Sequence, residues 1–318
     1  SPKFDLLIVD EAQDLVPLQW RMIDVMADSA REVVYAGDDD QCIYEWTGVD
    51  PKDYIRRCEY PEVLDVSYRV PRSVHRVASS LINRLTERVP KEWEPMDREG
   101  SVSYHYDIYS VDMSEGNWMI LCRTNAIANK VANTLKASGY LFYRQGSGFS
   151  ASARVIDSIK IWTRLSRGEF ITQADLKRMW QLINMNKGQR ARGNKLIKTW
   201  EPDQLVSIDI LLDVMPEENW KEPWFKALKI TQGEELYLRS VLRSGDTFDE
   251  KNPRIRVSTI HRVKGGECDN VVVLLDSSRG CQTLGSEDAE IRTFYVGFTR
   301  AKENLHIIES NQRWAFKL

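Results

Sequence analysis

Short apolar runs alternate with amphipathic segments over most of the chain. Residues 4–9, 33–36 and 63–66 are short, mainly apolar runs, and we expect each to form a buried strand. A helix is expected at residues 18–31, because Pro17 suits a first helical turn and the following apolar residues recur at helical spacing. Strand and helix therefore follow one another from the first residues onward.

The same alternation continues after Pro71, where apolar residues again recur at helical spacing until Pro90. The remaining expected elements are strands at 118–122, 255–260, 270–275 and 305–308, and a helix that carries Ile127, Val131 and Leu135 and stops near Gly139. Strands that alternate with helices predict a parallel sheet covered by helices, which is an α/β fold.

The character of the chain changes between Ser152 and Ser244. This stretch is helical in pattern and poor in strand signals, and it holds half of the ten tryptophans. We interpret it as an inserted helical subdomain. The tryptophans concerned are Trp162, Trp180, Trp200, Trp220 and Trp224.

Composition excludes several classes of protein. Hydrophobic residues make up 42% and charged residues 29%, as in a soluble globular protein, and no apolar run approaches the ~20 residues of a membrane span. The five cysteines are scattered without a CxxC pair, so neither a disulfide framework nor a zinc cluster is indicated. We expect a cytoplasmic protein. The net charge of −3 argues against nucleic-acid binding through bulk charge, although a local basic groove would suffice.

The strongest local signal is the segment 7–14, LIVDEAQD, an apolar strand that ends in adjacent carboxylates. Open α/β folds bind ligands at the carboxyl edge of the sheet. One of the two carboxylates, Asp10 or Glu11, can hold Mg²⁺ there while the other orients an attacking water. For a bare Asp-Glu pair, the alternative is an acidic strand end that caps the next helix.

Further segments strengthen the first interpretation because they follow in a fixed order. With segment 7–14 they resemble the motifs of superfamily 1 DNA helicases of the UvrD/Rep type, over the whole chain except the helical insert, where the likeness is only architectural. The segments are 37–46 (GDDDQCIYEW), 68–71 (YRVP), 118–125 (WMILCRTN), 257–267 (VSTIHRVKGGE) and 295–302 (YVGFTRAK).

The resemblance implies RecA-like parallel-sheet domains and a motor that hydrolyses ATP. The first RecA-like domain would contribute residues 1–66 and the second residues 67–151 and 251–318. Residues 152–250 would be the insertion, in the place of the family's accessory domain 2B. The implied activity is translocation on single-stranded DNA, in the 3′→5′ direction, with strand separation at single-strand/duplex junctions by a monomer.

The resemblance also implies which residues handle the nucleotide. The implied roles are Asp10 for Mg²⁺, Glu11 for the attacking water, Gln41 for sensing the γ-phosphate, Arg69 and Arg300 as arginine fingers, Tyr68 on the adenine, Glu267 on the ribose and Gly265 beside the nucleotide. For three of these residues there is an alternative: Tyr68 could be a packed core tyrosine, Arg300 a surface helix charge and Glu267 a solvated strand-edge carboxylate.

Contacts with single-stranded DNA are implied for residues of two motifs. Trp46, with Tyr44 beside it, would stack on bases, and Thr259, His261 and Lys264 would face the DNA backbone. The alternatives are a core tryptophan for Trp46 and a core or hinge histidine for His261.

The insert carries a basic stretch in which Gly188 and Gly193 are expected to loosen the chain. Such a charge run is usually a solvated face, and DNA contact is the alternative. If the stretch contacts DNA, neutralising it should lower both the DNA affinity and its dependence on salt. The basic residues are Lys187, Arg190, Arg192, Lys195 and Lys198.

The chain departs from the family pattern in three places. No GxxxxGK[ST] string occurs, so the family's phosphate-binding loop is missing, and we expect a fragment that neither binds ATP tightly nor unwinds DNA alone. Thr47 stands where the family has an arginine that links the nucleotide cleft to DNA. Gly266 stands where leucine is usual, which should loosen the turn.

Two other functions compete with a helicase. One is the motor part of a helicase-nuclease, and the other is a non-catalytic DNA-binding relic of a motor. The pathway, whether repair, replication or phage replication, is left open by these residues.

Overall fold

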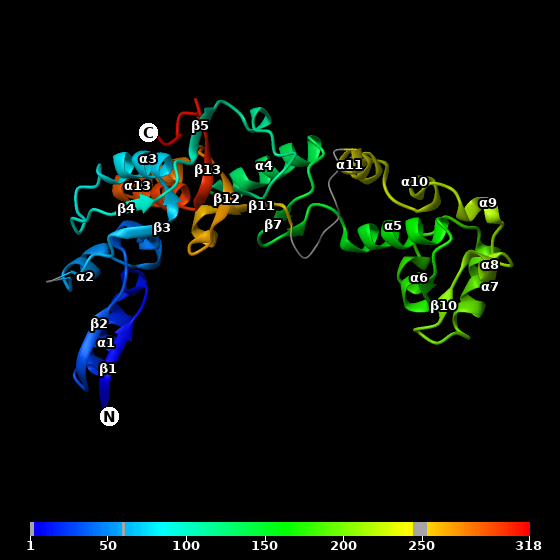
Figure 1. The fold of residues 1–318 in the computed structure, drawn as a ribbon, viewed down its shortest axis with the longest axis horizontal. Coiled ribbons are helices and arrows are strands. Elements are labelled where there is room, and N and C mark those ends of the chain that lie inside the picture. The colour runs from blue at the N-terminus through cyan, green and yellow to red at the C-terminus, as the bar shows by residue number, and fades with distance from the viewer. Residues whose placement is uncertain (1–2, 59–60, 244–252) are drawn as a thin grey trace. The chain divides into compact units, whose positions relative to one another are not determined.

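The computed structural model describes residues 3–58, 61–243 and 253–318, which form two compact units (Figure 1). One unit comprises residues 1–133 and 254–318, and the other comprises residues 134–253. The expected ends of the insert at Ser244 and residue 250 lie outside the described residues. The division of the chain into two RecA-like domains stays a prediction.

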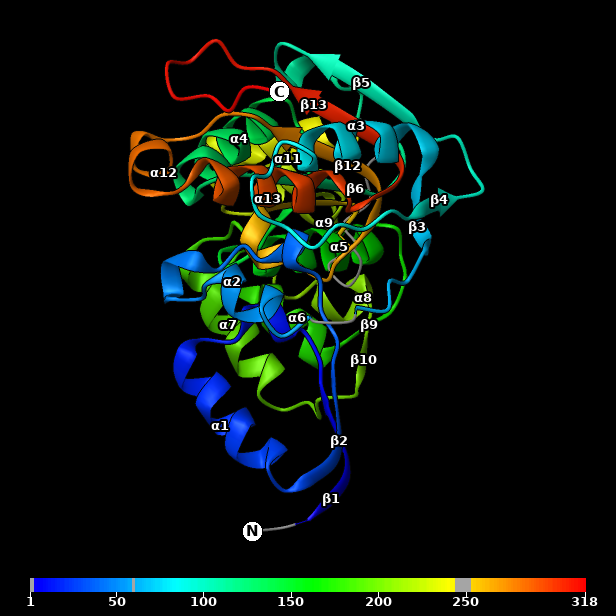
Figure 2. The same cartoon turned by 90° about the vertical axis from the view of Figure 1, so that its left-hand side faces the viewer.

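The first unit begins with a parallel pair of strands, β1 (Phe4–Val9) and β2 (Ala30–Tyr35), joined by helix α1 (Pro17–Ala27). Figure 2 shows α1 alongside this pair. Both strands were expected to be buried, but Val9 is the one buried residue of the two, because the pair is a two-stranded sheet that no other described strand joins. Trp20 of α1 is buried between Tyr35 and the guanidinium of Arg57, which lies 4.1 Å from the centre of the indole ring. The helix was expected to reach residue 31 but ends at Ala27, because the chain already enters β2 at Ala30.

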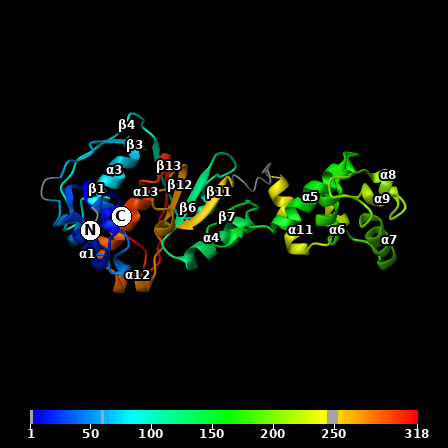
Figure 3. The same cartoon turned by 90° about the horizontal axis from the view of Figure 1, so that it is seen from below.

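The main sheet of the first unit confirms the predicted α/β fold. It contains β5 (Ser101–His105), β13 (Ala301–Ile308), β12 (Cys268–Leu274), β6 (Trp118–Cys122) and β11 (Ile255–Thr259), in that order and all parallel. Figure 3 shows four of these strands in their order in the sheet, which is β13, β12, β6 and β11. Every residue of β6 is buried, as expected for a central strand of a covered parallel sheet.

Helices α3 (Arg72–Ile82) and α13 (Glu287–Phe298) belong to the same unit, and α4 (Asn125–Ala137) begins in it. Apolar residues of α3 and α13 share one core with β12 and β13. The shorter elements are β3 (Val66–Pro71), which pairs with β4 (Glu94–Met96), and the helices α2 (Pro51–Ile55) and α12 (Arg279–Leu284).

Two expected boundaries in this region were wrong. The strand expected at 63–66 begins only at Val66 and carries the YRVP segment instead, while residues 61–65 are irregular and exposed. The helix after Pro71 ends at Ile82 rather than near Pro90, because an irregular polar segment follows it.

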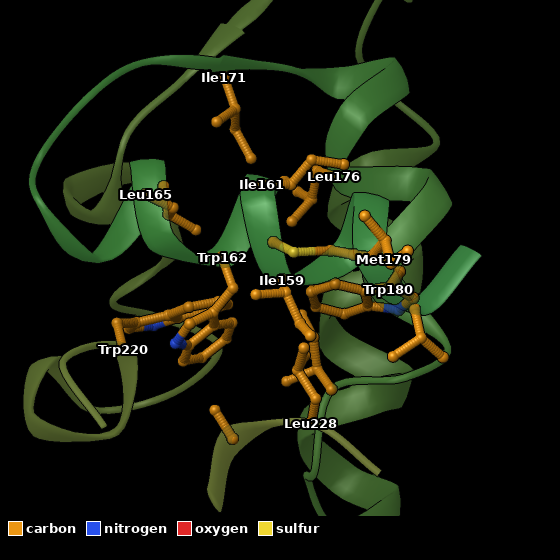
Figure 4. Packing of buried hydrophobic residues seen from close by; sticks show 14 of the residues in the cluster. Ile159, Ile161, Trp162, Leu165, Ile171, Leu176, Met179, Trp180, Trp220 and Leu228 are labelled. Atoms are coloured by element: carbon orange, nitrogen blue, oxygen red, sulfur yellow. The ribbon is translucent and has the colours of Figure 1, made fainter. Parts of the chain in front are cut away.

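The second unit has its own hydrophobic core. Trp162 stacks on Trp220 with ring centres 5.6 Å apart, and both are fully buried (Figure 4). Trp180 lies in the same cluster. These tryptophans therefore stabilise the unit and are not available for stacking on a ligand.

Most of this unit is helical, with two short antiparallel strand pairs, β7 with β8 and β9 with β10. No helix within the described ranges is both long and apolar enough to cross a bilayer. The elements are β7 (Tyr143–Arg144), β8 (Gly148–Phe149), α5 (Ala153–Ser166), β9 (Ile171–Thr172), α6 (Gln173–Trp180), α7 (Lys187–Ile197), β10 (Leu205–Val206), α8 (Ile208–Leu211), α9 (Glu217–Trp220), α10 (Trp224–Ala227) and α11 (Gln232–Arg243).

Candidate functional site

The carboxylates that follow β1 lie in a strained turn. Glu11 has φ of 49°, and among the described residues it is the one non-glycine residue with positive φ. Its backbone N–H donates to Asp10 Oδ1 at 2.8 Å, while its carboxylate stays largely exposed. Strain of this kind costs on the order of 1–3 kcal/mol and is concentrated at functional sites. The Glu11 side chain makes no capping hydrogen bond to the helix that follows, and ligand contacts of Asp10 and Glu11 stay predictions.

Gln13 connects this turn to the next motif. Its Nε2 donates to Glu11 Oε2 at 2.6 Å, and its Oε1 accepts from the backbone N–H of Asp38 at 3.0 Å. A Cβ at Gly37 would overlap Gln13 Oε1, so only glycine fits there. The end of β1 and the segment after β2 thus form one hydrogen-bonded network.

Gln41 lies between an aspartate and an arginine. Its Nε2 donates to Asp38 Oδ2 at 2.6 Å, and its Oε1 accepts from Arg300 Nη2 at 3.2 Å. The contact joins two motifs that are separated by more than 250 residues in sequence. Because the Gln41 amide is hydrogen-bonded on both sides, movement of Asp38 or of Arg300 would disturb one of its hydrogen bonds.

Arg300 is buried, with an exposed fraction of 1%. Its Nε donates to Val296 O at 2.9 Å and its Nη1 to Gly266 O at 3.3 Å. Burial, together with the positive charge of Arg69, lowers its pKa to about 10, so it is still charged at neutral pH. The alternative of a surface helix charge is therefore wrong.

Arg69 adds a second guanidinium beside Arg300. Its Nε is buried without a hydrogen-bond partner, and burial lowers the pKa of the group. Two neighbouring guanidiniums, one of them with an unused donor, suit an anionic ligand such as a phosphate. Contacts of Arg69 and Arg300 with the phosphate groups of ATP stay predictions.

Tyr68 and Glu267 lie toward solvent. Tyr68 is 90% exposed, so the alternative of a packed core tyrosine is wrong. Glu267 is half-exposed and forms an ion pair with Lys302 at 3.3 Å, and Gly265, with φ of +84°, shapes the turn before it. Gly266 is the residue that was expected to loosen this turn. Its φ is not positive, and a Cβ at this position would lie 3.1 Å from Val263 O. Contacts of Tyr68, Glu267 and Gly265 with a nucleotide stay predictions.

Lys264 lies among carboxylates rather than on an open groove. Its side chain is 8% exposed, and its Nζ pairs with Asp14 and, at 3.4 Å, with Glu11 Oε2. The ammonium also lies 5.4 Å from the centre of the Tyr44 ring. In this structure the Lys264 ammonium forms ion pairs with carboxylates of the protein itself, so its expected contact with the DNA backbone stays a prediction.

Among the candidate DNA-binding residues, Tyr44 lies beside this lysine and contacts His261. Tyr44 donates from its hydroxyl to His261 O at 2.9 Å, and Thr259 is buried at the end of β11. Burial and the nearby charge of Arg123 lower the pKa of His261 to about 4, so the imidazole is neutral. Trp46 is 77% exposed, and the alternative of a core tryptophan is wrong.

Thr47, at the position of the family's arginine, closes a local turn. Its hydroxyl donates to Tyr44 O at 2.7 Å. The side chain is too short to link distant groups as an arginine can. Two residues earlier, Glu45 Oε1 lies 3.4 Å from Arg292 Nη1 of α13.

The basic stretch of the second unit forms a continuous helix, α7, so the expectation that its glycines loosen the chain was wrong. A Cβ at Gly193 would overlap the ring of Trp180, which shows that this glycine permits close packing. Arg190 donates to Trp180 O and Ile183 O, and Arg192 donates to Asp213 O and Val214 O. Two of the five cations are therefore structural.

Several charged residues of the site were missed from the sequence. Arg88, Lys91 and Arg292 bind the segment that contains three consecutive aspartates, and Arg123 forms a buried ion pair with Glu290 at 2.6 Å. Three adjacent aspartates were the available signal, because carboxylates that become buried together need cations.

The chain is similar to known DNA helicases. Residues 1–59 match the model of the UvrD/REP helicase N-terminal domain, and residues 225–312 match that of the UvrD-like helicase C-terminal domain. An ATP-dependent DNA helicase PcrA from Leuconostoc citreum is 26% identical over 98% of this chain and 55% of its own length. A probable DNA helicase II homolog from Mycoplasma pneumoniae is 22% identical over the same shares.

A PcrA from Staphylococcus aureus is 29% identical over 33% of this chain and 15% of its own length. The chain spans about half the length of the first two relatives.

Proposed function

We propose that this chain, which belongs to the UvrD/PcrA-like superfamily 1 helicases, forms part of a motor that couples ATP hydrolysis to 3′→5′ movement along single-stranded DNA. The observation that carries the proposal is the contact between Gln41 and Arg300, with Arg69 beside it. It joins two of the motifs around the expected γ-phosphate position.

In the proposed reaction, each group at the cleft has one task. Glu11 orients a water for attack on the γ-phosphate, and Arg69 and Arg300 stabilise the charge that develops on the transferred phosphoryl group. Asp10 is exposed at the strand end and would hold Mg²⁺, which neutralises charge on the phosphates. Gln41 senses whether the phosphate is present, because any displacement of Arg300 disturbs its hydrogen bond.

On the DNA side, Trp46 stacks on a base and Tyr44 holds the turn that presents it. A motor of this kind would act as a monomer at single-strand/duplex junctions, and it would work on DNA in the cytoplasm. The sequence has no phosphate-binding loop, so we expect the chain by itself to bind ATP weakly and not to hydrolyse it.

DNA binding can be tested on the chain itself with a fluorescein-labelled oligo(dT) strand in an anisotropy titration. Replacing Trp46 by Ala should weaken binding by about 1–3 kcal/mol, which is roughly 5- to 150-fold. Tyr106→Ala is the matched control, because Tyr106 is equally exposed but lies outside the motifs. Equal affinities of the two variants would refute the stacking role.

The motor activity is tested on the whole protein. Single-stranded DNA should stimulate its ATP hydrolysis, and Glu11→Gln should abolish the stimulated activity without loss of DNA binding. DNA binding without stimulated hydrolysis would instead favour the non-catalytic relic.

A further inference from the structure

Three consecutive carboxylates, Asp38, Asp39 and Asp40, lie close together after β2. Their oxygens lie within 4.8 Å of one another, and Asp39 and Asp40 are completely buried. Buried like charges at this distance repel strongly unless cations neutralise them. The segment can therefore keep this conformation only with help from elsewhere in the unit.

Lys91 supplies the central cation. Its Nζ lies 2.8 Å from Asp38 Oδ1 and 3.2 Å from Asp40 Oδ2, and it also pairs with Asp39. The lysine side chain is only 13% exposed. The ammonium thus occupies the position between the three carboxylates where a metal ion would otherwise be expected, so the cluster is an ion-pair network and not a metal site.

Arg88 and the neighbouring backbone complete the network. Arg88 contacts both oxygens of Asp40, with Nη2 at 2.7 Å from Oδ2 and Nε at 3.1 Å from Oδ1. The backbone N–H of Val89 donates to Asp39 Oδ2 at 2.9 Å, and Arg292 of α13 donates to Asp39 O at 3.1 Å. All these partners follow residue 67, and none belongs to the helicase motifs that the sequence reveals.

The network reaches the γ-phosphate sensor through Asp38. While Asp38 Oδ1 is held by Lys91, its Oδ2 accepts the hydrogen bond from Gln41 Nε2 at 2.6 Å. The other end of the Gln41 amide accepts from Arg300. Lys91, Asp38, Gln41 and Arg300 therefore form one continuous chain of contacts.

The charge state of the network fits this arrangement. Burial acts to raise the pKa of Asp38, but Lys91, the Gln41 amide and the backbone N–H of Asp40 together outweigh it, and the net effect is a lowered pKa. Burial and the charge of Asp38 raise the pKa of Asp40 to about 6. Asp38, which binds Gln41, thus stays ionised at neutral pH.

We propose that Lys91 is a positioning residue for ATP hydrolysis, which holds Asp38 so that the Gln41 amide faces Arg300. Lys91 would act through Asp38 and Gln41 and would not touch the nucleotide. The proposal rests on the proposed function, because Gln41 matters for hydrolysis only in an ATP-driven motor.

The test is the ATP hydrolysis of the whole protein at saturating single-stranded DNA. Lys91→Met should lower kcat by up to about 10²-fold, the typical cost of a small misplacement at a reacting centre, with little change in KM for ATP. Lys91→Arg retains the charge and should restore part of the lost kcat. Lys52→Met is the matched control, because Lys52 also pairs with a carboxylate, that of Glu87, but on the surface.

A double-mutant cycle separates positioning from general destabilisation. Asp38→Asn should lower kcat as Lys91→Met does, and the double variant should be no slower than either single variant, because both act through one path. Multiplying effects, or a wild-type kcat in Lys91→Met, would overturn the proposal. If Lys91→Met does not fold, Asp38→Asn decides, since a wild-type kcat there has the same meaning. A wild-type protein without DNA-stimulated hydrolysis would instead refute the proposed function.

Discussion

Arg300 Nη2 donates a hydrogen bond to Gln41 Oε1 at 3.2 Å. The two residues come from opposite ends of the sequence, Gln41 from the segment after β2 and Arg300 from the turn between α13 and β13. The contact is one of several that join the segments after β1 and β2 to the rest of the first unit. A phosphate that attracted Arg300 would compete with Gln41 for the same guanidinium, which is a physical route from hydrolysis to movement.

Replacing Arg300 by Lys should remove this route while keeping a positive charge. Lysine lacks the fork that lets arginine hold Gln41, Val296 and Gly266 at once. If Arg300 acts as an arginine finger, kcat for DNA-stimulated ATP hydrolysis by the whole protein should fall by about 10³-fold or more. Steady-state kinetics at saturating DNA measures this, and an unchanged kcat would contradict the assignment.

Arg98→Lys provides the control for this substitution. Arg98 forms a half-exposed ion pair with Glu303 at 2.7 Å, and such pairs contribute little. It should leave kcat and DNA affinity unchanged.

The central elements of the fold were predictable because their physical signal is local. All five residues of β6 are apolar and all are buried, so composition alone indicates a covered strand. The strand expected at 63–66 was wrong because Leu64 and Val66 are exposed, and apolar character there does not report burial. The adjoining YRVP segment pairs with β4 instead, a non-local partner that periodicity does not reveal.

The candidate site likewise contains residues that were predictable from the sequence and residues that were not. The motif residues were recognisable because each motif is a short, specific string. The partners of Lys264 were not, since Asp14 lies 250 positions away and only the folded chain brings them together. Lys91 carried no local signal either, because it stands in a polar connection that resembles any other loop.

The cations of α7 should separate into two groups. Arg190→Gln with Arg192→Gln should lower the stability of the second unit, because each guanidinium donates to two backbone carbonyls that would lose their partner. Lys187 and Lys195 of α7 and Lys198, which directly follows it, are exposed, and replacing all three by Gln should leave the unfolding midpoint unchanged. Urea unfolding followed by hydrogen exchange of α7 distinguishes the two variants.

The same lysine variant tests whether α7 contacts DNA. Three lost phosphate contacts on a single strand would reduce the slope of log affinity against log salt by about 2. An unchanged slope would identify the helix face as solvated.

His261 should make the first unit sensitive to acid. Burial, assisted by Arg123, lowers its pKa in the folded state to about 4 from the usual 6.5. Between these values the unfolded chain binds more protons, so the free energy of unfolding should fall as the pH falls from about 6.5 to about 4. The loss from this group is about 2–3 kcal/mol at pH 4.5.

The contribution of His261 is measured as the difference in the free energy of unfolding between His261→Gln and wild type. This comparison is needed because Asp40, whose pKa is raised to about 6, makes the folded state more stable as the pH falls over part of the same range. His261→Gln cannot titrate, so its stability relative to wild type should improve by that amount between pH 7.5 and pH 4.5. Urea unfolding followed by hydrogen exchange of β11 reports on this unit. Parallel pH profiles would mean that His261 is protonated normally in the folded state.

We predict that any side chain at position 193 lowers the stability of the second unit. A Cβ at this position would overlap the Cζ2 and Cη2 atoms of Trp180, which is buried and donates from Nε1 to Asn194 Oδ1 at 2.8 Å. Gly193→Ala should therefore destabilise the unit by about 1–3 kcal/mol, although alanine favours a helix. Gly233→Ala in α11 is the matched control, since no heavy atom lies within 4 Å of its Cβ, and it should gain up to about 1 kcal/mol. The free energies of unfolding, from urea titrations followed by hydrogen exchange of α6 and α11, should differ in sign. Equal stability of the two variants would mean that Trp180 moves aside without cost.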